Sequence, residues 1–267
     1  MLLKGRDRLG FIFAGLAVLT KQHAALPALL MLAVLCRHMK TRRLLENCAL
    51  VAGMFVVVSL PFIFGGNLIP YLRSVFFPAQ SPGYQTPLVY AFGGIGSFLT
   101  YLHEACHLNT AWLFVYCIPL LAAAVISAVV LCYVKKIRLE QASLIGILLF
   151  VALFYRVNYQ YLIMYLPLAL FALAVSRRWL ERSFLLALVI LPAVWIWLFD
   201  VSFWFRYLKP YADDSPQILK TLGLTHYTPD QVFVSLAVLL MALCLVYSGI
   251  VLLRRKEQQA AASQVPG

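Results

Sequence analysis

Acidic residues are scarce in this sequence, which holds 10 Asp and Glu among 267 residues. Charged residues of both signs make up 12% of the chain, whereas a soluble domain has roughly 25%. Hydrophobic residues account for 63%. This composition excludes a soluble globular domain and indicates an integral membrane protein.

Signatures of common cofactors are also missing. The sequence has no Walker-type glycine loop, no dinucleotide-binding fingerprint and no haem attachment motif. Its six cysteines form no disulfide framework, because five lie in or beside apolar stretches and only Cys106 lies in a predicted external loop. No cofactor is assigned from these residues, and a requirement for a divalent cation stays open.

Positive charge is plentiful but divided among short segments. The net charge is +12, and five clusters occupy every second gap between the hydrophobic stretches. The clusters are Lys4/Arg6/Arg8, Arg37/Lys40/Arg42/Arg43, Lys135/Lys136/Arg138, Arg177/Arg178/Arg182 and Arg254/Arg255/Lys256. The positive-inside rule predicts that they are cytoplasmic and that the other gaps face a periplasm, an archaeal surface or an ER lumen. Because no single basic face with stacking aromatics results, nucleic-acid binding is excluded.

Eight apolar segments are separated by these gaps. They cover residues 9–20, 24–36, 44–64, 110–134, 139–155, 159–175, 183–204 and 231–253. We predict an all-α polytopic membrane protein with about eight transmembrane segments and both termini in the cytoplasm. Residues 1–256 form one transmembrane domain with external loops at 65–109 and 205–230, and 257–267 form a disordered cytoplasmic tail.

Four of the eight segments are shorter than the roughly 20 residues that a helix needs to cross a bilayer. They pair as 9–20 with 24–36 and 139–155 with 159–175, which predicts two short-helix hairpins. The turns would then lie below the outer membrane surface, where polar backbone is tolerated only in a protein-lined cavity. We therefore predict a recessed cationic site containing Lys21 and Arg156. Simple snorkelling of these two side chains to the interface is the alternative.

Three segments resemble the GT-C superfamily of glycosyltransferases, above all the dolichyl-phosphate-glucose glucosyltransferases and the mannosyltransferase that starts GPI-anchor assembly. The matching residues are Lys21-Gln22 between apolar runs with Pro27, Ser59-Leu60-Pro61-Phe62 followed by Leu72 to Pro78, and Val157 to Leu162 followed by Tyr165-Leu166-Pro167. The order and the predicted membrane side of these segments agree with the family, and the resemblance covers about residues 9–175.

The resemblance implies inverting transfer of a hexose from a polyprenyl-phosphate carrier to a glycan, lipid or protein acceptor on the external face. Cations held in a water-poor cavity would stabilise the phosphate as it leaves. Lys21 and Arg156 are then expected to bind the carrier phosphate, with Arg73 as a further contact. The expected donor or acceptor contacts are Gln22, His23, Tyr84, Asn158, Tyr159 and Gln160.

One feature of the family has no counterpart here. Its catalytic acidic residue lies in the first external loop, between the first two membrane helices, and no external carboxylate precedes Lys21 in this sequence. The chain therefore resembles the C-terminal part of such an enzyme, with an N-terminal half or a partner subunit elsewhere. The external carboxylates that could replace the missing base are Glu104, Asp213 and Asp214.

The segment His103-Glu104-Ala105-Cys106-His107 suggests a second function, that of an integral-membrane zinc metalloprotease. Two His one helical turn apart can bind zinc while the Glu acts as general base, provided that all lie on one helix. A helix is predicted at about 95–105, so His107 falls at its boundary. A polar interfacial helix without chemistry, or an acceptor contact of a transferase, is the other interpretation of this segment.

A lipid or solute transporter is the third class of function that broken hairpins and buried cations allow. Such proteins often contain inverted repeats. The two predicted turns share no sequence and have the same orientation, so an inverted repeat is not supported.

Overall fold

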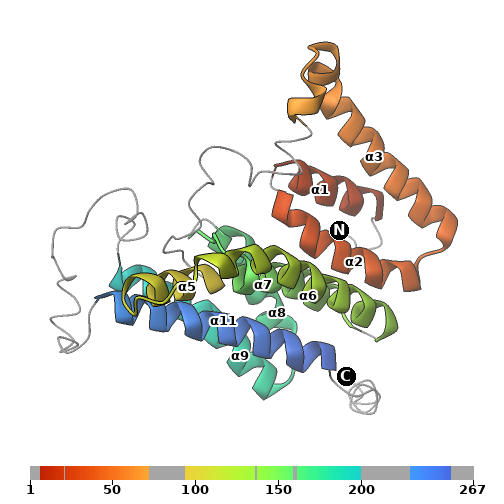
Figure 1. The fold of residues 1–267 in the computed structure, drawn as a ribbon. Coiled ribbons are helices and arrows are strands. Elements are labelled where there is room, and N and C mark those ends of the chain that lie inside the picture. Colours follow the sequence, from red (N-terminus) through yellow and green to blue (C-terminus); the bar gives the residue numbers. More distant parts are fainter. Residues whose placement is uncertain are drawn as a thin grey trace.

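The computed structural model describes six ranges of the chain. They are residues 7–20, 22–71, 94–135, 137–158, 161–199 and 229–253. About 87% of these residues are helical, and no strand occurs among them. The predicted all-α class is confirmed for the described part of the chain (Figure 1).

Nine α-helices account for most of the described chain. They are α1 (Asp7–Thr20), α2 (Ala25–His38), α3 (Thr41–Phe64), α5 (Ile95–Glu104), α6 (Phe114–Val134), α7 (Leu139–Leu153), α8 (Leu162–Val175), α9 (Trp179–Leu198) and α11 (Pro229–Leu253). Short 3₁₀ turns precede two of them, η2 (Gln22–Ala24) before α2 and η5 (Ala111–Leu113) before α6. Each of the eight predicted apolar segments overlaps one helix, and α5 is the additional helix predicted near 95–105.

Four helical segments are long and apolar enough to cross a membrane, namely Thr41–Phe64, Ala111–Val134, Trp179–Leu198 and Gln231–Leu253. Helices α1, α2 and α8 have 14 residues each and α7 has 15. These lengths fall short of the roughly 20 residues of a full span, as the sequence predicts for its two hairpins. The protein is therefore a helical membrane protein with four candidate spans in the described part of the chain, and the crossing of all eight segments stays a prediction.

Helix α7 is the centre of the structure. Every residue from Gln141 to Leu153 is buried, and helices α2, α6, α8 and α11 pack around it (Figure 1). A helix that is apolar on all sides is stable only when other elements cover it on all sides. The continuous apolar run of α7 therefore explains its central place.

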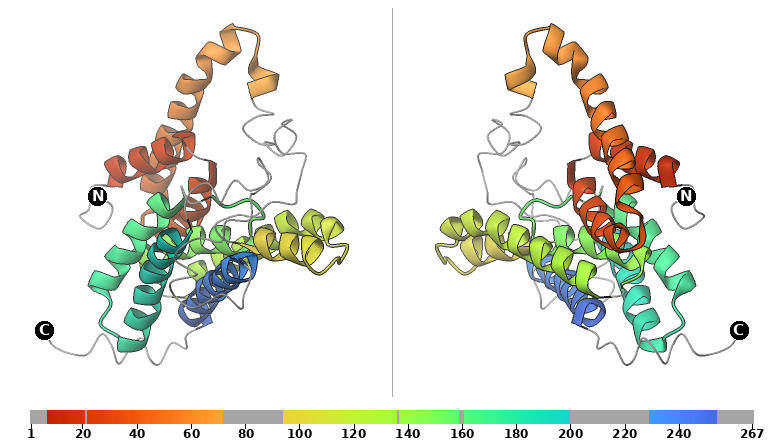
Figure 2. Two further views of the ribbon diagram at one scale, coloured as in Figure 1. Left: turned by 90° about the vertical axis from the view of Figure 1, so that its left-hand side faces the viewer. Right: turned by 90° about the vertical axis from the view of Figure 1, so that its right-hand side faces the viewer.

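Helices α1 and α3 are peripheral by contrast. Among the residues of α3 only Asn47 is buried, and the helix contacts mainly α1. Figure 2 shows α3 leaning away from the helices around α7. In a membrane protein, an apolar helix exposed in this way is in contact with lipid.

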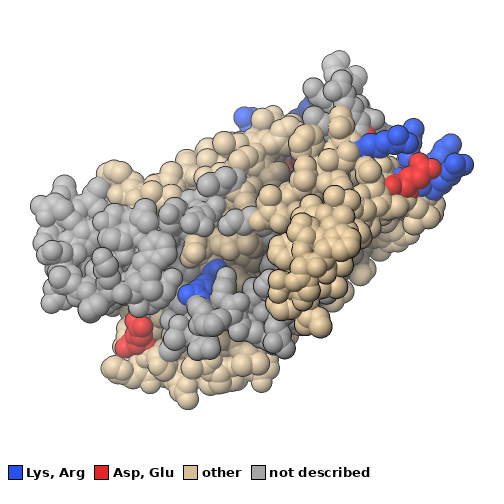
Figure 3. Space-filling view, turned by 90° about the horizontal axis from the view of Figure 1, so that it is seen from above, with Lys and Arg blue, Asp and Glu red and all other residues tan. Residues whose placement is uncertain are grey.

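Described members of four basic clusters lie near one end of the helices. The Arg43 Nη1 atom lies 3.7 Å from the Asp7 Oδ2 atom, and the guanidinium of Arg37 donates to the Lys135 carbonyl. Lys135 in turn donates to the carbonyl of Leu252 over 2.6 Å, close to the end of α11. In the view from above, the largest group of basic side chains lies at one edge (Figure 3). This gathering agrees with the predicted common cytoplasmic side.

A buried carboxylate joins three helix ends there. Glu181, 3% exposed at the start of α9, accepts hydrogen bonds from Gln141 Nε2 at 2.7 Å and from Arg138 Nη2 at 3.3 Å. Arg138 also donates to the carbonyl of Val175, near the end of α8, over 3.5 Å. A buried charge needs such partners to remain ionised. Glu181 therefore ties α9 to α7 and α8.

We expect Glu181→Ala to lower the free energy of unfolding by about 2–3 kcal/mol, because hydrogen bonds to a charged group are lost in a buried place. Glu46→Ala is the matched control, since Glu46 pairs with Arg42 on the surface at 3.0 Å, and it should cost about 0.5 kcal/mol or less. Thermal unfolding in detergent measures both. Equal shifts for the two variants would contradict the assigned role of Glu181.

Candidate functional site

The first predicted polar turn contacts residues on both sides of the second one in the chain. The ring of His23, in the turn between α1 and α2, stacks on Phe150 of α7 with centroids 4.8 Å apart. It also meets Tyr161, which precedes α8, edge to face at 4.5 Å. Phe150 and Tyr161 lie 5.0 Å apart, so the three rings contact one another. Residues more than 120 positions apart thus form one site.

The end of α1 and the start of α2 determine the shape of the first turn. Helix α1 ends at Thr20, whose hydroxyl donates to the carbonyl of Ala17 over 2.9 Å. Such a bond offers the backbone an alternative to continuing the helix. Pro27 lies in the first turn of α2, where the missing N–H has no helical partner to lose. The chain between the two helices is therefore a short 3₁₀ turn that carries His23.

Close packing of α2 on α7 brings His23 to its ring partners. Gly146 of α7 faces the backbone of Pro27, and a Cβ atom at this position would lie 2.6 Å from the Pro27 Cα and N atoms. Only glycine allows the two helices this separation. Phe150 lies one helical turn further along α7, beside His23.

The second turn begins where α7 ends. Its backbone becomes extended at Phe154, after which Tyr155 and Val157 are buried while Arg156 and Asn158 are half-buried. The backbone N–H of Tyr161 donates to the carbonyl of Asn158 over 3.1 Å and leads the chain into α8. The alternation places the side chains of Tyr155 and Val157 inward and leaves those of Arg156 and Asn158 partly exposed.

A third element, the start of α5, covers the second turn. A Cβ atom at Gly96 would lie 1.8 Å from the carbonyl oxygen of Tyr155, and one at Gly94 would lie 2.3 Å from that of Phe154. Gly94 also has a φ of +79°, a backbone conformation that favours glycine. The residues just before Arg156 are therefore held by an external segment as well as by α7.

This arrangement can bind an anionic group. The second turn carries the guanidinium of Arg156 and the carboxamide of Asn158, and the imidazole of His23 contacts the rings of Phe150 and Tyr161 on both sides of this turn in the chain. Anions are bound most strongly by charge-assisted hydrogen bonds in surroundings with little water. Phosphate and carboxylate are the anions whose geometry matches an Arg side chain.

Of the predicted phosphate and sugar contacts, the structure places His23, Arg156 and Asn158 in this region, and the Gln22 backbone lies in η2. The others lie outside the described residues, and these are Lys21, Arg73, Tyr84, Tyr159 and Gln160. Of the predicted carboxylates, Asp213 and Asp214 also lie outside them.

Glu104 is described and is not brought to the turns. It is exposed and ends α5, eight residues after Gly96, which corresponds to about 12 Å along the helix axis. The contact of α5 with the second turn is at the opposite end of that helix. Its position gives no support to Glu104 as a base acting at these turns.

The zinc-protease geometry is not formed either. Helix α5 ends at Glu104, and His107 follows it with a φ of +55°, so the two imidazoles do not share a helix face. The His103 Nδ1 atom lies 3.1 Å from the carbonyl oxygen of Leu108. Within the described ranges, no three His, Cys, Asp or Glu side chains are grouped so as to hold a metal ion.

Several contacts of this site were not predicted from the sequence. Phe150 and Tyr161 contact His23, while Gly94, Gly96 and Gly146 set the approach of the backbones. Gly94 and Gly96, at the start of α5, were the available sequence signal for close packing. The partners of those glycines are far away in the chain, so the signal gives no position for them.

Comparison with known proteins gives no match, since no family model, no curated protein and no solved structure matches this chain. Its fold and its site are therefore interpreted from its own residues.

We expect Gly146→Ala to separate α2 from α7 and to lower the free energy of unfolding by about 1–3 kcal/mol through overpacking. Gly249→Ala in α11 is the control, because a Cβ atom there meets nothing within 4 Å. This second change should be neutral or stabilising by about 0.5–1 kcal/mol. Thermal unfolding in detergent compares the two variants, and a neutral Gly146→Ala would contradict the described contact.

Proposed function

We propose that this chain is a membrane glycosyltransferase of the GT-C type, or the C-terminal part of one. It transfers a hexose from a polyprenyl-phosphate carrier to a glycan, lipid or protein acceptor. The site faces the external side of a prokaryotic plasma membrane or the lumen of the ER. The residues that carry the proposal belong to the two short-helix turns.

The contact of His23 with Phe150 and Tyr161 is the observation that supports this function most directly. A carrier phosphate requires cations and hydrogen-bond donors from more than one segment, gathered where little water enters. In support of the proposal, His23 contacts Phe150 and Tyr161, which lie on both sides of Arg156 and Asn158 in the chain. Lys21 itself lies outside the described residues, two positions before His23 in the chain.

The proposed reaction is a displacement at the anomeric carbon of the hexose. An acceptor hydroxyl forms the new bond to this carbon while the bond to the phosphate oxygen breaks. The electron pair of the broken bond stays on the polyprenyl phosphate, whose added negative charge Lys21 and Arg156 stabilise. The hydroxyl proton passes to a general base. No nucleotide takes part.

The base is expected from an upstream segment of the enzyme or from a partner subunit. This follows from the resemblance, in which the acidic residue belongs to the first external loop. Among the described carboxylates, Glu104 lies at the far end of α5, and Glu181 is buried among partners at the basic end. Neither of them is placed to accept a proton at the two turns.

We expect Lys21→Ala and Arg156→Ala each to weaken binding of a polyprenyl-phosphate hexose at least tenfold, because each removes a charge-assisted hydrogen bond to phosphate. Arg177→Ala is the control, since this exposed Arg belongs to the basic end. The measurement is the dissociation constant of polyprenyl-phosphate mannose or glucose for purified protein in detergent. Unchanged affinity in both variants would remove the basis of the proposal.

We further expect His103→Ala to change neither the zinc content of the purified protein nor its binding of the polyprenyl-phosphate hexose. The reason is that His107 lies beyond the helix that carries His103, which leaves the zinc pattern incomplete. Elemental analysis of wild type and variant tests this. A stoichiometric zinc ion in the wild type that is lost in the variant would favour the protease.

A further inference from the structure

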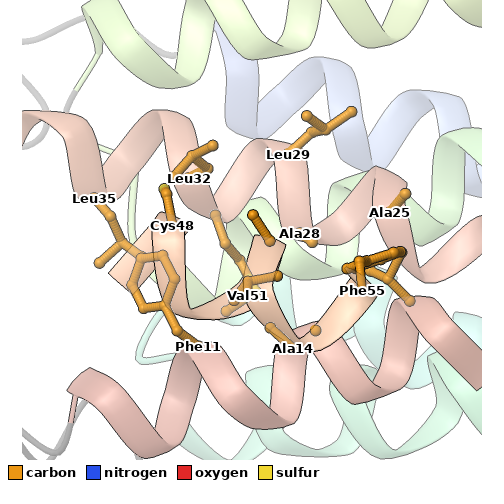
Figure 4. Close-up of a pocket in the computed structure, with 14 residues that line it drawn as sticks. Phe11, Ala14, Ala25, Ala28, Leu29, Leu32, Leu35, Cys48, Val51 and Phe55 are labelled. Carbon is orange, nitrogen blue, oxygen red and sulfur yellow. The ribbon is translucent and has the colours of Figure 1, made fainter. Parts of the chain in front are cut away.

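An apolar groove runs between α1, α2 and α3, from the start of α2 beside the first turn to the basic end. Its volume is about 350 Å³, and every residue that lines it is apolar apart from the Cys48 thiol. Its walls include Phe11, Ala14, Ala28, Leu32, Val51 and Phe55. Figure 4 shows Phe11, Leu35 and Cys48 at one end of the groove and Ala25 and Phe55 at the other.

The size of the groove decides what kind of molecule it can hold. A volume of 350 Å³ falls in the range of roughly 300–1,000 Å³ that is typical of small-ligand sites. The groove therefore suits a slender apolar chain.

The length of the groove matches one leaflet of a bilayer. From Ala25 to Leu35 it follows ten residues of α2, which is about 15 Å along the helix axis. The hydrocarbon core of a membrane is about 30 Å thick, so one leaflet contributes about 15 Å. A lipid acyl chain standing along the membrane normal fits this length.

Charge at one end of the groove indicates the head group. The described residues beside Phe11, Leu35 and Cys48 include five basic side chains and two acidic ones. The basic ones are Arg8, Arg37, Lys40, Arg42 and Arg43, and the acidic ones are Asp7 and Glu46. An excess of three positive charges therefore remains, and the side chains of Arg42 and Arg43 are 92% and 71% exposed. Basic residues beside a membrane attract anionic lipid head groups.

We propose that the groove between α1, α2 and α3 binds an anionic phospholipid from the leaflet at the basic end, with an acyl chain along α2 and the head group on Lys40, Arg42 and Arg43. The head-group end of this site lies at the opposite end of α2 from His23, and the proposal does not depend on the proposed transferase function. The acyl chain occupies the groove that is lined by α1, α2 and α3. The ligand of this site is a structural lipid of the membrane.

Native mass spectrometry of the full chain in detergent tests the proposal, with added phosphatidylglycerol or phosphatidylcholine carrying identical acyl chains. The wild type should retain one phosphatidylglycerol and release phosphatidylcholine at the same concentration. Ala28→Phe fills the groove, and the triple change Lys40→Gln, Arg42→Gln and Arg43→Gln removes the head-group charges. Each should reduce the retained phosphatidylglycerol roughly tenfold.

Two control variants match these changes in chemistry and differ in place. Ala123→Phe adds the same ring to the exposed side of α6, and Arg177→Gln removes a basic charge elsewhere at the basic end. Both should retain phosphatidylglycerol like the wild type.

Ala14→Phe narrows the groove from α1. It provides a second blocking variant in case Ala28→Phe unfolds.

Other outcomes would overturn the proposal. Equal retention of both lipids would remove the role of the basic residues, and undiminished retention in Ala28→Phe and Ala14→Phe would remove the role of the groove. A competition with polyprenyl phosphate shows which kind of lipid the groove holds. If polyprenyl phosphate displaces phosphatidylglycerol, and the triple charge variant binds polyprenyl phosphate like the wild type, the groove holds the carrier and not a phospholipid of the basic leaflet.

Discussion

Full burial of a helix too short to cross a bilayer is the constraint on which the rest of the structure depends. Helix α7 is buried from Gln141 to Leu153. The backbone N–H and C=O groups at its two ends therefore need hydrogen-bond partners within the protein, because little water reaches them. At its start, Gln141 joins the buried Glu181, and the Gln141 side chain also accepts from the backbone N–H of Arg138 over 3.4 Å. At its other end, the start of α5 covers the carbonyls of Phe154 and Tyr155. The two ends thus acquire different chemistry.

This difference separates a structural end from a candidate functional end. At the basic end, cationic side chains donate to carbonyls of neighbouring helix ends, which fixes helices relative to one another. At the opposite end, the rings of Phe150 and Tyr161 contact His23, and the half-buried Arg156 follows residues that are held on two sides. Rigid support of a polar turn is what a site for a charged substrate needs, because an oriented cation binds more strongly than a mobile one.

Hydropathy and charge were sufficient to predict the helices and the shortness of four of them. Apolar runs set the segments, and the length of α7 or α2 could be counted directly from the chain. The contacts inside the site could not be predicted in this way. The approach of Gly146 to Pro27 depends on three-dimensional packing between residues far apart in sequence, and no local pattern specifies it. The bounds of α5 were predicted within a residue, but the hydrogen bond of 2.6 Å from Thr110 to the carbonyl of Leu99, which holds the following loop to this helix, was not.

The sparse packing of α3 has a consequence for exchange with the surrounding membrane. Since only Asn47 of this helix is buried, tilting α3 away from α1 breaks few contacts and leaves the packing around α7 intact. Local opening of a weakly packed element requires only a part of the free energy of global unfolding. The groove beside α1 is therefore bounded on one side by a helix whose opening is expected to cost less free energy than global unfolding, while the turns at His23 keep their geometry.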